Sequence, residues 1–173
     1  MAENESNNEQ AAATDQAGKP HFGLQRIYLK DMSFESPMAP LVFQEKWAPQ
    51  VKMDVNTEAK KIQDNIYEVV LSITVTVSSN DKTIYLAEVQ QAGVFSISGM
   101  EEAPLRHTIG AFCPNMLFPY ARETIDNLAT RGGFPALHLA PINFDAVFAE
   151  AMKNGTKPKE GEDEGDAASG VTH

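Results

Sequence analysis

The chain of 173 residues has one cysteine, few basic residues and no long hydrophobic run. Its single cysteine, Cys113, can form neither an intramolecular disulfide nor a zinc site of several thiolates. No apolar stretch approaches the roughly 18 residues of a membrane-spanning helix. The first residues also lack the basic and apolar regions of a signal peptide. These absences argue against a disulfide scaffold and against membrane insertion, and they predict a cytoplasmic protein whose thiol stays reduced.

Positive charge is scarce too, because 14 Lys and Arg stand against 24 Asp and Glu, for a net charge of −10. Nucleic-acid binding requires clustered Lys and Arg that replace condensed counterions, so nucleic acid is not expected as a partner. The chain has no GxxxxGK[ST] or GxGxxG phosphate-binding loop, no HExxH motif and no close pair of histidines beside a carboxylate. We therefore predict no nucleotide, metal or other cofactor, and a basic or unfolded protein as partner.

Both ends of the chain are polar and acidic. Residues 1–20 carry four acids against one lysine and no aromatic residue, and residues 153–173 carry five acids against three lysines. Neither segment has enough apolar surface to offset the entropy of ordering, so both are predicted to be disordered tails. Residues 21–152 are then the folded unit, which is long enough for one core.

The first half of this unit has the composition of β-strands. Residues 66–78 alternate apolar side chains with Glu, Ser and Thr, which is the period of a sheet with one buried face. Residues 79–81 are turn formers that lead to a second strand at residues 82–98, where Gly93 suggests a bulge or a close approach. The other two predicted strands are residues 24–36 and residues 51–56.

The second half changes to helical spacing. Apolar residues recur every three or four positions from Leu117 to Leu128, with Pro119 expected in the first turn. A second helix is predicted to follow the N-cap Asn143, with an apolar stripe that includes Phe148. Strands followed by helices predict an α+β fold, a four-stranded antiparallel sheet and then two helices. Two short helices cannot cover both faces of such a sheet, so we expect self-association.

Alternation along the strands places chemically similar side chains on shared faces. Asp31 and Glu35 lie on one face of the strand at residues 24–36, and Leu86 and Glu88 share a face of the strand at residues 82–98. Three residues point to the other side of that strand: Ala87, Val89 and Gln91. Neither side of this strand is wholly polar, so we expect something to cover each.

Cys113, with His107 six residues before it, is the strongest candidate for catalysis. A cysteine nucleophile needs a base and an electropositive setting that stabilises the thiolate. Cys113 instead lies in a mostly apolar run, and no helix is expected to begin directly after it. A buried structural thiol is the preferred interpretation. His138, between two leucines, is likewise interpreted as a packed histidine.

Several long motifs resemble the SecB family of bacterial protein-export chaperones. They are VQQAGVFSI at residues 89–97, CPNMLFPYARE at 113–123, APINFDA at 140–146, and RIY and KDMSFE between residues 26 and 35. The resemblance covers nearly the whole folded unit. It implies a homotetramer, a dimer of dimers, that is not an enzyme. It also implies an ATP-independent cytosolic holdase that keeps secretory precursors unfolded and delivers them to the SecA ATPase for export across the inner membrane.

The same resemblance implies three sets of functional residues. The family binds SecA through an acidic face of the sheet, matched here by Asp31, Glu35, Leu86 and Glu88. Its client groove is lined by aromatic residues, matched by Trp47 and Phe148. Positions near its tetramer interface are matched by Ala87, Val89 and Gln91. Two alternatives stay open: a thiol-dependent hydrolase that uses Cys113 and His107, and a scaffolding oligomer without clients.

Overall fold

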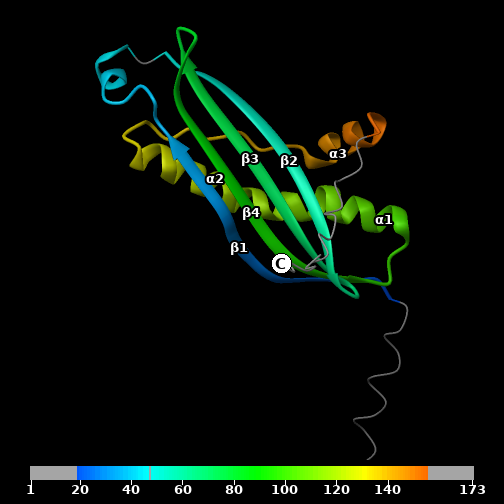
Figure 1. The fold of residues 1–173 in the computed structure, drawn as a ribbon. Helices are drawn as coiled ribbons and strands as arrows, with labels where there is room; N and C mark the ends of the chain where they lie inside the picture. Colours follow the sequence, from blue (N-terminus) through cyan, green and yellow to red (C-terminus); the bar gives the residue numbers. More distant parts are fainter. Residues whose placement is uncertain (1–18, 47, 156–173) are drawn as a thin grey trace, which may run out of the picture.

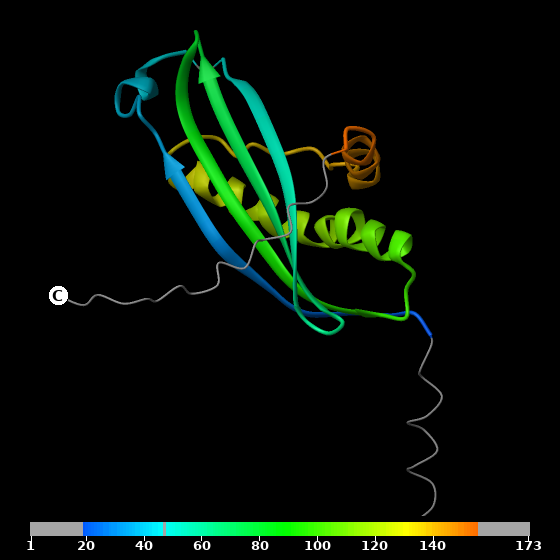
Figure 2. The same ribbon diagram turned by 45° about the vertical axis from the view of Figure 1, so that its right-hand side comes forward.

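The computed structural model describes residues 19–46 and 48–155, as an antiparallel sheet with helices on one of its faces (Figures 1 and 2). The strands are β1 (His21–Glu35), β2 (Gln50–Gln63), β3 (Ile66–Ser79) and β4 (Lys82–Ser98), in the order β1-β4-β3-β2. The helices are η1 (Leu41–Gln44), α1 (Glu102–His107), the π-helical η2 (Thr108–Phe112), α2 (Cys113–Arg131) and α3 (Phe144–Lys153). The predicted α+β fold is confirmed. The predicted tails lie largely outside the described residues.

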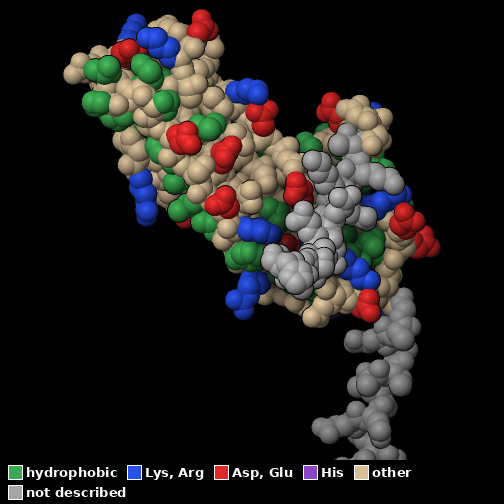
Figure 3. Space-filling view, viewed as in Figure 1, with side chains coloured by type: hydrophobic (Ala, Val, Ile, Leu, Met, Phe, Trp, Pro, Cys, Tyr) green, Lys and Arg blue, Asp and Glu red, His purple; other side chains and the backbone are tan. Residues whose placement is uncertain are grey.

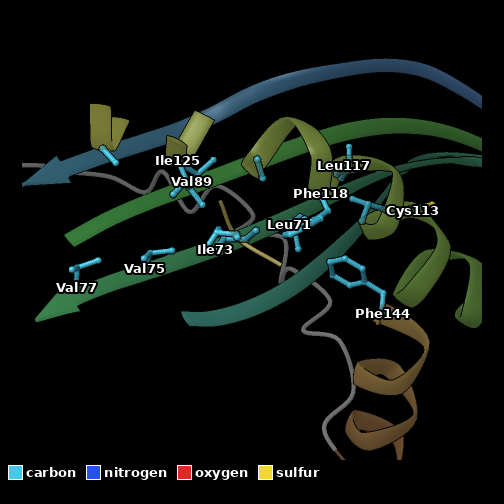
Figure 4. Packing of buried hydrophobic residues seen from close by; sticks show 14 of the residues in the cluster. Leu71, Ile73, Val75, Val77, Val89, Cys113, Leu117, Phe118, Ile125 and Phe144 are labelled. Carbon is cyan, nitrogen blue, oxygen red and sulfur yellow. The ribbon is translucent and has the colours of Figure 1, made fainter. Parts of the chain in front are cut away.

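The alternating pattern of β3 has the expected consequence. Every second side chain from Val69 to Val77 is buried, and the residues between them are half-buried, except Val70, which is buried as well. The buried side chains face α2, which crosses this side of β3 and β4 (Figure 1). Figure 4 shows Leu117 and Ile125 of α2 packed against strand residues such as Leu71 and Ile73. One face of the sheet is thus covered within a single chain.

The close approach predicted at Gly93 is confirmed, and the bulges lie elsewhere. A Cβ atom on Gly93 would lie 2.7 Å from Cε2 of Phe95 and 3.0 Å from Cδ2 of Leu117. A side chain there would therefore push α2 away from the sheet. The register of β1 against β4 shifts at two points, between Leu24 and Arg26 and between Leu29 and Asp31. These irregularities bend the edge strand β1 rather than β4.

The strand β2 is longer than predicted. The prediction stopped at residue 56 because the residues that follow, in the second half of the strand, lack apolar alternation. Its pairing with β3 continues from Gln50 to Gln63, well past residue 56. Most side chains of this half are polar and exposed, as in an edge strand, and Ala59 is the one that packs against the core.

The predicted helix start at Pro119 is wrong. Helical backbone begins at Glu102 and continues through η2 into α2, so Pro104 occupies the first turn and Pro119 lies inside α2. Pro119 and Asn115, four residues earlier, are both exposed, so water can bind the carbonyl that the proline leaves free. The helix α2 ends at Arg131, directly before Gly132 and Gly133. Within the described part of the chain, no helix is both long enough and apolar enough to cross a bilayer.

Candidate protein-binding surfaces

The face of the sheet opposite α2 carries a group of acidic side chains. Cross-strand neighbours share a face, and the register pairs Asp31 with Gln90, Ser33 with Glu88 and Glu35 with Leu86. The predicted shared face of Asp31 with Glu35 and that of Leu86 with Glu88 are therefore confirmed, and the two pairs lie on the same side of the sheet. We call these four residues the acidic face.

The carboxylates of the acidic face are exposed, whereas Leu86, opposite Glu35 and two residues before Glu88, is half-buried. The Ser33 hydroxyl donates a 3.4 Å hydrogen bond to Oε2 of Glu88, which leaves the other carboxylate oxygen accessible. Figure 3 shows acidic side chains spread over this side of the sheet. An exposed carboxylate cluster around an apolar side chain suits a basic segment with an apolar anchor.

Sequence reasoning missed that the acidic character continues across the sheet to β2. Glu88 pairs with Thr74, and Thr74 pairs with Asp54 on β2, so these three residues form one row. Asp54 is exposed, and its carboxylate forms a 2.8 Å ion pair with Lys52. The polar half of the alternation at residues 51–56 was the available signal.

At its other end the same face is neutralised by a hydrogen-bonded cluster. Tyr28 donates a hydrogen bond to the Glu68 carboxylate, which also forms a 2.8 Å ion pair with Lys30. Burial raises the pKa of Glu68, but the bonds from Lys30 and Tyr28 outweigh it and hold that pKa below its usual value. Burial and the Glu68 charge raise the pKa of Tyr28 to about 12. Negative charge is therefore concentrated at the end that carries Asp31, Glu35 and Glu88.

The three positions predicted near an interface lie inside the single chain. Ala87, Val89 and Gln91 are all buried, on the side of β4 that α2 covers. The Gln91 side chain donates a 2.9 Å hydrogen bond to the carbonyl oxygen of Tyr28, next to the irregularity in β1. Their side chains cannot touch a second copy without movement of α2, and their role in assembly stays a prediction.

The two residues of the hypothetical thiol site have different surroundings. Cys113 is fully buried, and burial raises the pKa of its thiol to about 12. Helical backbone is continuous from Glu102 through Cys113, so no free helix N-terminus lies beside its thiol, as the sequence predicted. Nε2 of His107 lies 2.9 Å from Oδ1 of Asp145, and its ring contacts Phe148 edge to face. His107 thus interacts with α3. The described residues also include no group of three potential metal ligands.

We expect Cys113 to resist alkylation by iodoacetamide at pH 8 in the native protein and to react fully in denaturant. With a pKa near 12 only about one thiol in ten thousand is ionised at that pH. Mass spectrometry of timed samples measures both rates. Native labelling as fast as denatured labelling would show an accessible, ionised thiol and would revive the hydrolase alternative.

Phe148, the predicted client-contacting residue on α3, is half-buried in a notch of the helical segment before α2. Its ring lies directly over Gly110, where a Cβ atom would come within 2.6 Å of Cε2. The helix is held by its N-cap, since Oδ1 of Asn143 accepts a 3.0 Å hydrogen bond from the amide of Ala146. Phe144 anchors the same helix against Phe118 of α2, with ring centroids 5.8 Å apart. Trp47, the other predicted residue, lies outside the described residues.

The described residues that flank Trp47 include apolar side chains that sequence reasoning did not assign. Leu41 and Phe43 of the loop between β1 and β2 are 64% and 53% exposed, and Val51 and Met53 follow at the start of β2. Phe43 rests on Phe134, with ring centroids 5.2 Å apart. The signal was weak, because two apolar residues in a proline-bounded loop read equally well as core. We call Leu41, Phe43, Val51 and Met53 the apolar rim.

His138 is not a packed histidine, so this interpretation was wrong. The residue is exposed and has φ +49°, a left-handed backbone that non-glycine residues rarely adopt. Its amide and that of Leu137 both donate to Oδ1 of Asp126, each at 3.1 Å. The two flanking leucines, rather than the histidine, face the core.

Comparisons with known proteins agree on one family. The family model described as preprotein translocase subunit SecB matches residues 15–155. Protein-export protein SecB of Marinobacter nauticus is 55% identical over 166 residues, which cover 96% of this chain and 98% of that one. The protein of the same name from Hahella chejuensis is 64% identical over 135 residues, with 78% and 85% covered.

A solved structure is also similar in fold. It is a SecB-like chaperone of Mycobacterium tuberculosis in complex with a ChAD peptide from an antitoxin. Its TM-score is 0.59 at 18% sequence identity, over 70% of this chain and 90% of that one.

Proposed function

The chain belongs to the SecB family of protein-export chaperones, and from this premise we propose an ATP-independent holdase that delivers its clients to SecA. As a member of this family it is a chaperone rather than an enzyme. In the proposed cycle it binds unfolded secretory precursors in the cytoplasm, keeps them competent for translocation and releases them at SecA. The observation that best supports delivery is the acidic face, which no element of the described chain covers.

The acidic face is the proposed docking site for SecA. Asp31, Glu35 and Glu88 present exposed carboxylates, and Leu86 supplies an apolar contact beside Glu35 and Glu88. Exposed charges of one sign attract a basic partner and speed its approach, and salt screens this attraction. Because α2 lies on the other side of the sheet, SecA on the acidic face would leave the helical side free for a client.

Client binding is proposed to use Trp47 and Phe148, together with the apolar rim. Burying one client side chain contributes about 1.5–3 kcal/mol. A micromolar complex needs about 8 kcal/mol after ordering costs, so one long client must fill several sites at once. A dimer of dimers would repeat these sites four times and raise their effective concentration for one chain.

Self-association into this tetramer is supported by apolar surface that one chain leaves uncovered. Leu24, Leu29 and Met32 of the edge strand β1 are 39%, 42% and 49% exposed. An edge strand with exposed apolar side chains is a ready pairing surface for a second copy. We propose that Ala87, Val89 and Gln91 affect assembly indirectly, because they determine how α2 and β1 sit on β4.

The experiment for client binding uses an unfolded precursor and the single Trp47→Ala variant. Wild-type protein is expected to bind the unfolded precursor and to ignore its folded form. Trp47→Ala is expected to weaken the unfolded complex about tenfold, since one buried aromatic contact is lost, without changing the oligomer mass. Calorimetric titration and light scattering measure the two quantities. Equal affinity of variant and wild type would remove Trp47 from the client site.

A further inference from the structure

The middle of the segment between α2 and α3, residues 132–143, is hydrogen-bonded to one carboxylate of α2. Oδ1 of Asp126, on the last turns of α2, accepts hydrogen bonds from the amides of Leu137 and His138, both 3.1 Å long. These bonds fix the middle of the connector, eleven and twelve residues along the chain from their acceptor. Hydrogen bonds to a charged acceptor are stronger than neutral ones, so this clamp contributes more than an ordinary loop contact.

The clamp acts at a backbone position that is unfavourable by itself. His138 has φ +49°, in the left-handed region where a non-glycine side chain costs free energy. Its ring is exposed, and the core beside it receives Leu137 and Leu139 instead. The conformation therefore needs an outside constraint, and the Asp126 carboxylate supplies it.

Both ends of the connector touch residues of the proposed client surface. At its start, the Phe134 ring packs against the rings of Phe43, in the apolar rim, and Tyr85. The ring centroids lie 5.2 Å and 4.7 Å apart, respectively. At its end, Asn143 caps the helix that carries Phe148. Figures 1 and 2 show the connector running from the end of α2 to α3. Its path sets where these two parts of the surface lie.

Tyr85 shows that the Asp126 charge is close to this aromatic cluster. Burial, and then the Asp126 carboxylate, raise the pKa of Tyr85 to about 12. Its hydroxyl is buried, and within the described residues it has no hydrogen-bond partner. The Tyr85 ring thus packs against Phe134, which supports the apolar rim, and lies within reach of the Asp126 charge.

We propose that Asp126 is a positioning residue for client binding. It clamps the connector that joins Phe134, on which the Phe43 ring packs, to α3, which carries Phe148. This inference rests on the proposed client surface and adds a residue that does not itself touch the client. Asp126 belongs to no sequence motif singled out above, and only the folded chain brings it to residues 137 and 138.

The test compares Asp126→Ala with Asp126→Asn, which keeps the Oδ1 acceptor. Asp126→Ala is expected to weaken binding of an unfolded precursor about tenfold, and Asp126→Asn about twofold or less. Hydrogen exchange should show the Leu137 and His138 amides exposed in Asp126→Ala and protected in Asp126→Asn. Glu123→Ala, an exposed acid one turn earlier on α2, is the matched control and should bind like wild type.

A double-mutant cycle separates positioning from general loss of stability. If Asp126 affects client affinity by fixing the position of the Phe43 ring, Asp126→Ala should cost much less affinity in a Phe43→Ala background than in wild type. His138→Gly relieves the left-handed backbone and should restore part of the affinity lost in Asp126→Ala, even if that variant is destabilised.

The outcomes distinguish this inference from the function on which it rests. Wild-type protein that binds no unfolded precursor overturns both. Wild-type binding together with equal affinity in Asp126→Ala, or with fully additive losses in the cycle, overturns the clamp alone. Loss in Asp126→Ala, recovery in Asp126→Asn and a non-additive cycle support it.

Discussion

Glu88→Lys is expected to weaken SecA binding at least about tenfold and to leave both client holding and oligomer mass unchanged. The side chain is exposed on β4, in one row with Ser33 and near the carboxylates of Asp31 and Glu35. Reversing its charge replaces attraction for a basic partner by repulsion at the centre of the acidic face. The opposite side of the same strand packs under α2, so the core is not disturbed.

Two control variants make this result specific to the acidic face. Glu88→Gln removes the charge but keeps the shape, and its loss should be smaller and should shrink as salt is raised. Glu123→Lys makes the same charge change on α2, on the other side of the sheet, and should bind SecA like wild type. Calorimetric titration with purified SecA measures all three. Equal losses in Glu88→Lys and Glu123→Lys would mean that only net charge matters.

Gly110→Ala is expected to reduce client affinity about as much as Phe148→Ala, roughly tenfold, with little change in stability. Alanine normally stabilises a helix relative to glycine by about 1 kcal/mol. Here the added methyl group would collide with the Phe148 ring, which is half-buried and can turn outward. The stability gain and the lost ring contact should nearly cancel, while the ring leaves its position on the client surface.

The double variant Gly110→Ala with Phe148→Ala tests this steric account. Once the ring is removed, the methyl group meets no obstacle, so the double variant should unfold at higher denaturant than Phe148→Ala alone. Its client affinity should equal that of Phe148→Ala. Wild-type affinity in Gly110→Ala would show that the Phe148 ring position is irrelevant to clients, and a large loss of stability would show that α3 moves as a whole.

The sheet could be predicted closely, because burial follows alternation. The strand at residues 82–98 has the predicted bounds, and β3 differs by one residue. The same alternation placed Asp31 with Glu35, and Leu86 with Glu88, on one face of their own strands, and the register shows that these two faces are the same side of the sheet. Where alternation was absent, as in the second half of β2, backbone pairing with a neighbour determined the strand instead, and the local sequence carries no trace of that.

The helices and the client surface were less accessible. Proline is compatible both with a first helical turn and with an exposed position in a helix, so Pro119 alone could not locate the start of α2. The contacts of Phe148 with Gly110 and of Phe43 with Phe134 join residues far apart in the chain. The hydrogen bonds of Asp126 could not be predicted either, since its partners, the amides of Leu137 and His138, depend on the path of the connector.

The most direct test of the proposed function is light scattering from a denatured secretory precursor that is diluted with and without this protein, in the absence of nucleotide. The account predicts that aggregation is suppressed at about one tetramer per client, and that added SecA then takes up the client. Unchanged aggregation would contradict the holdase function, while the fold and the acidic face would stand.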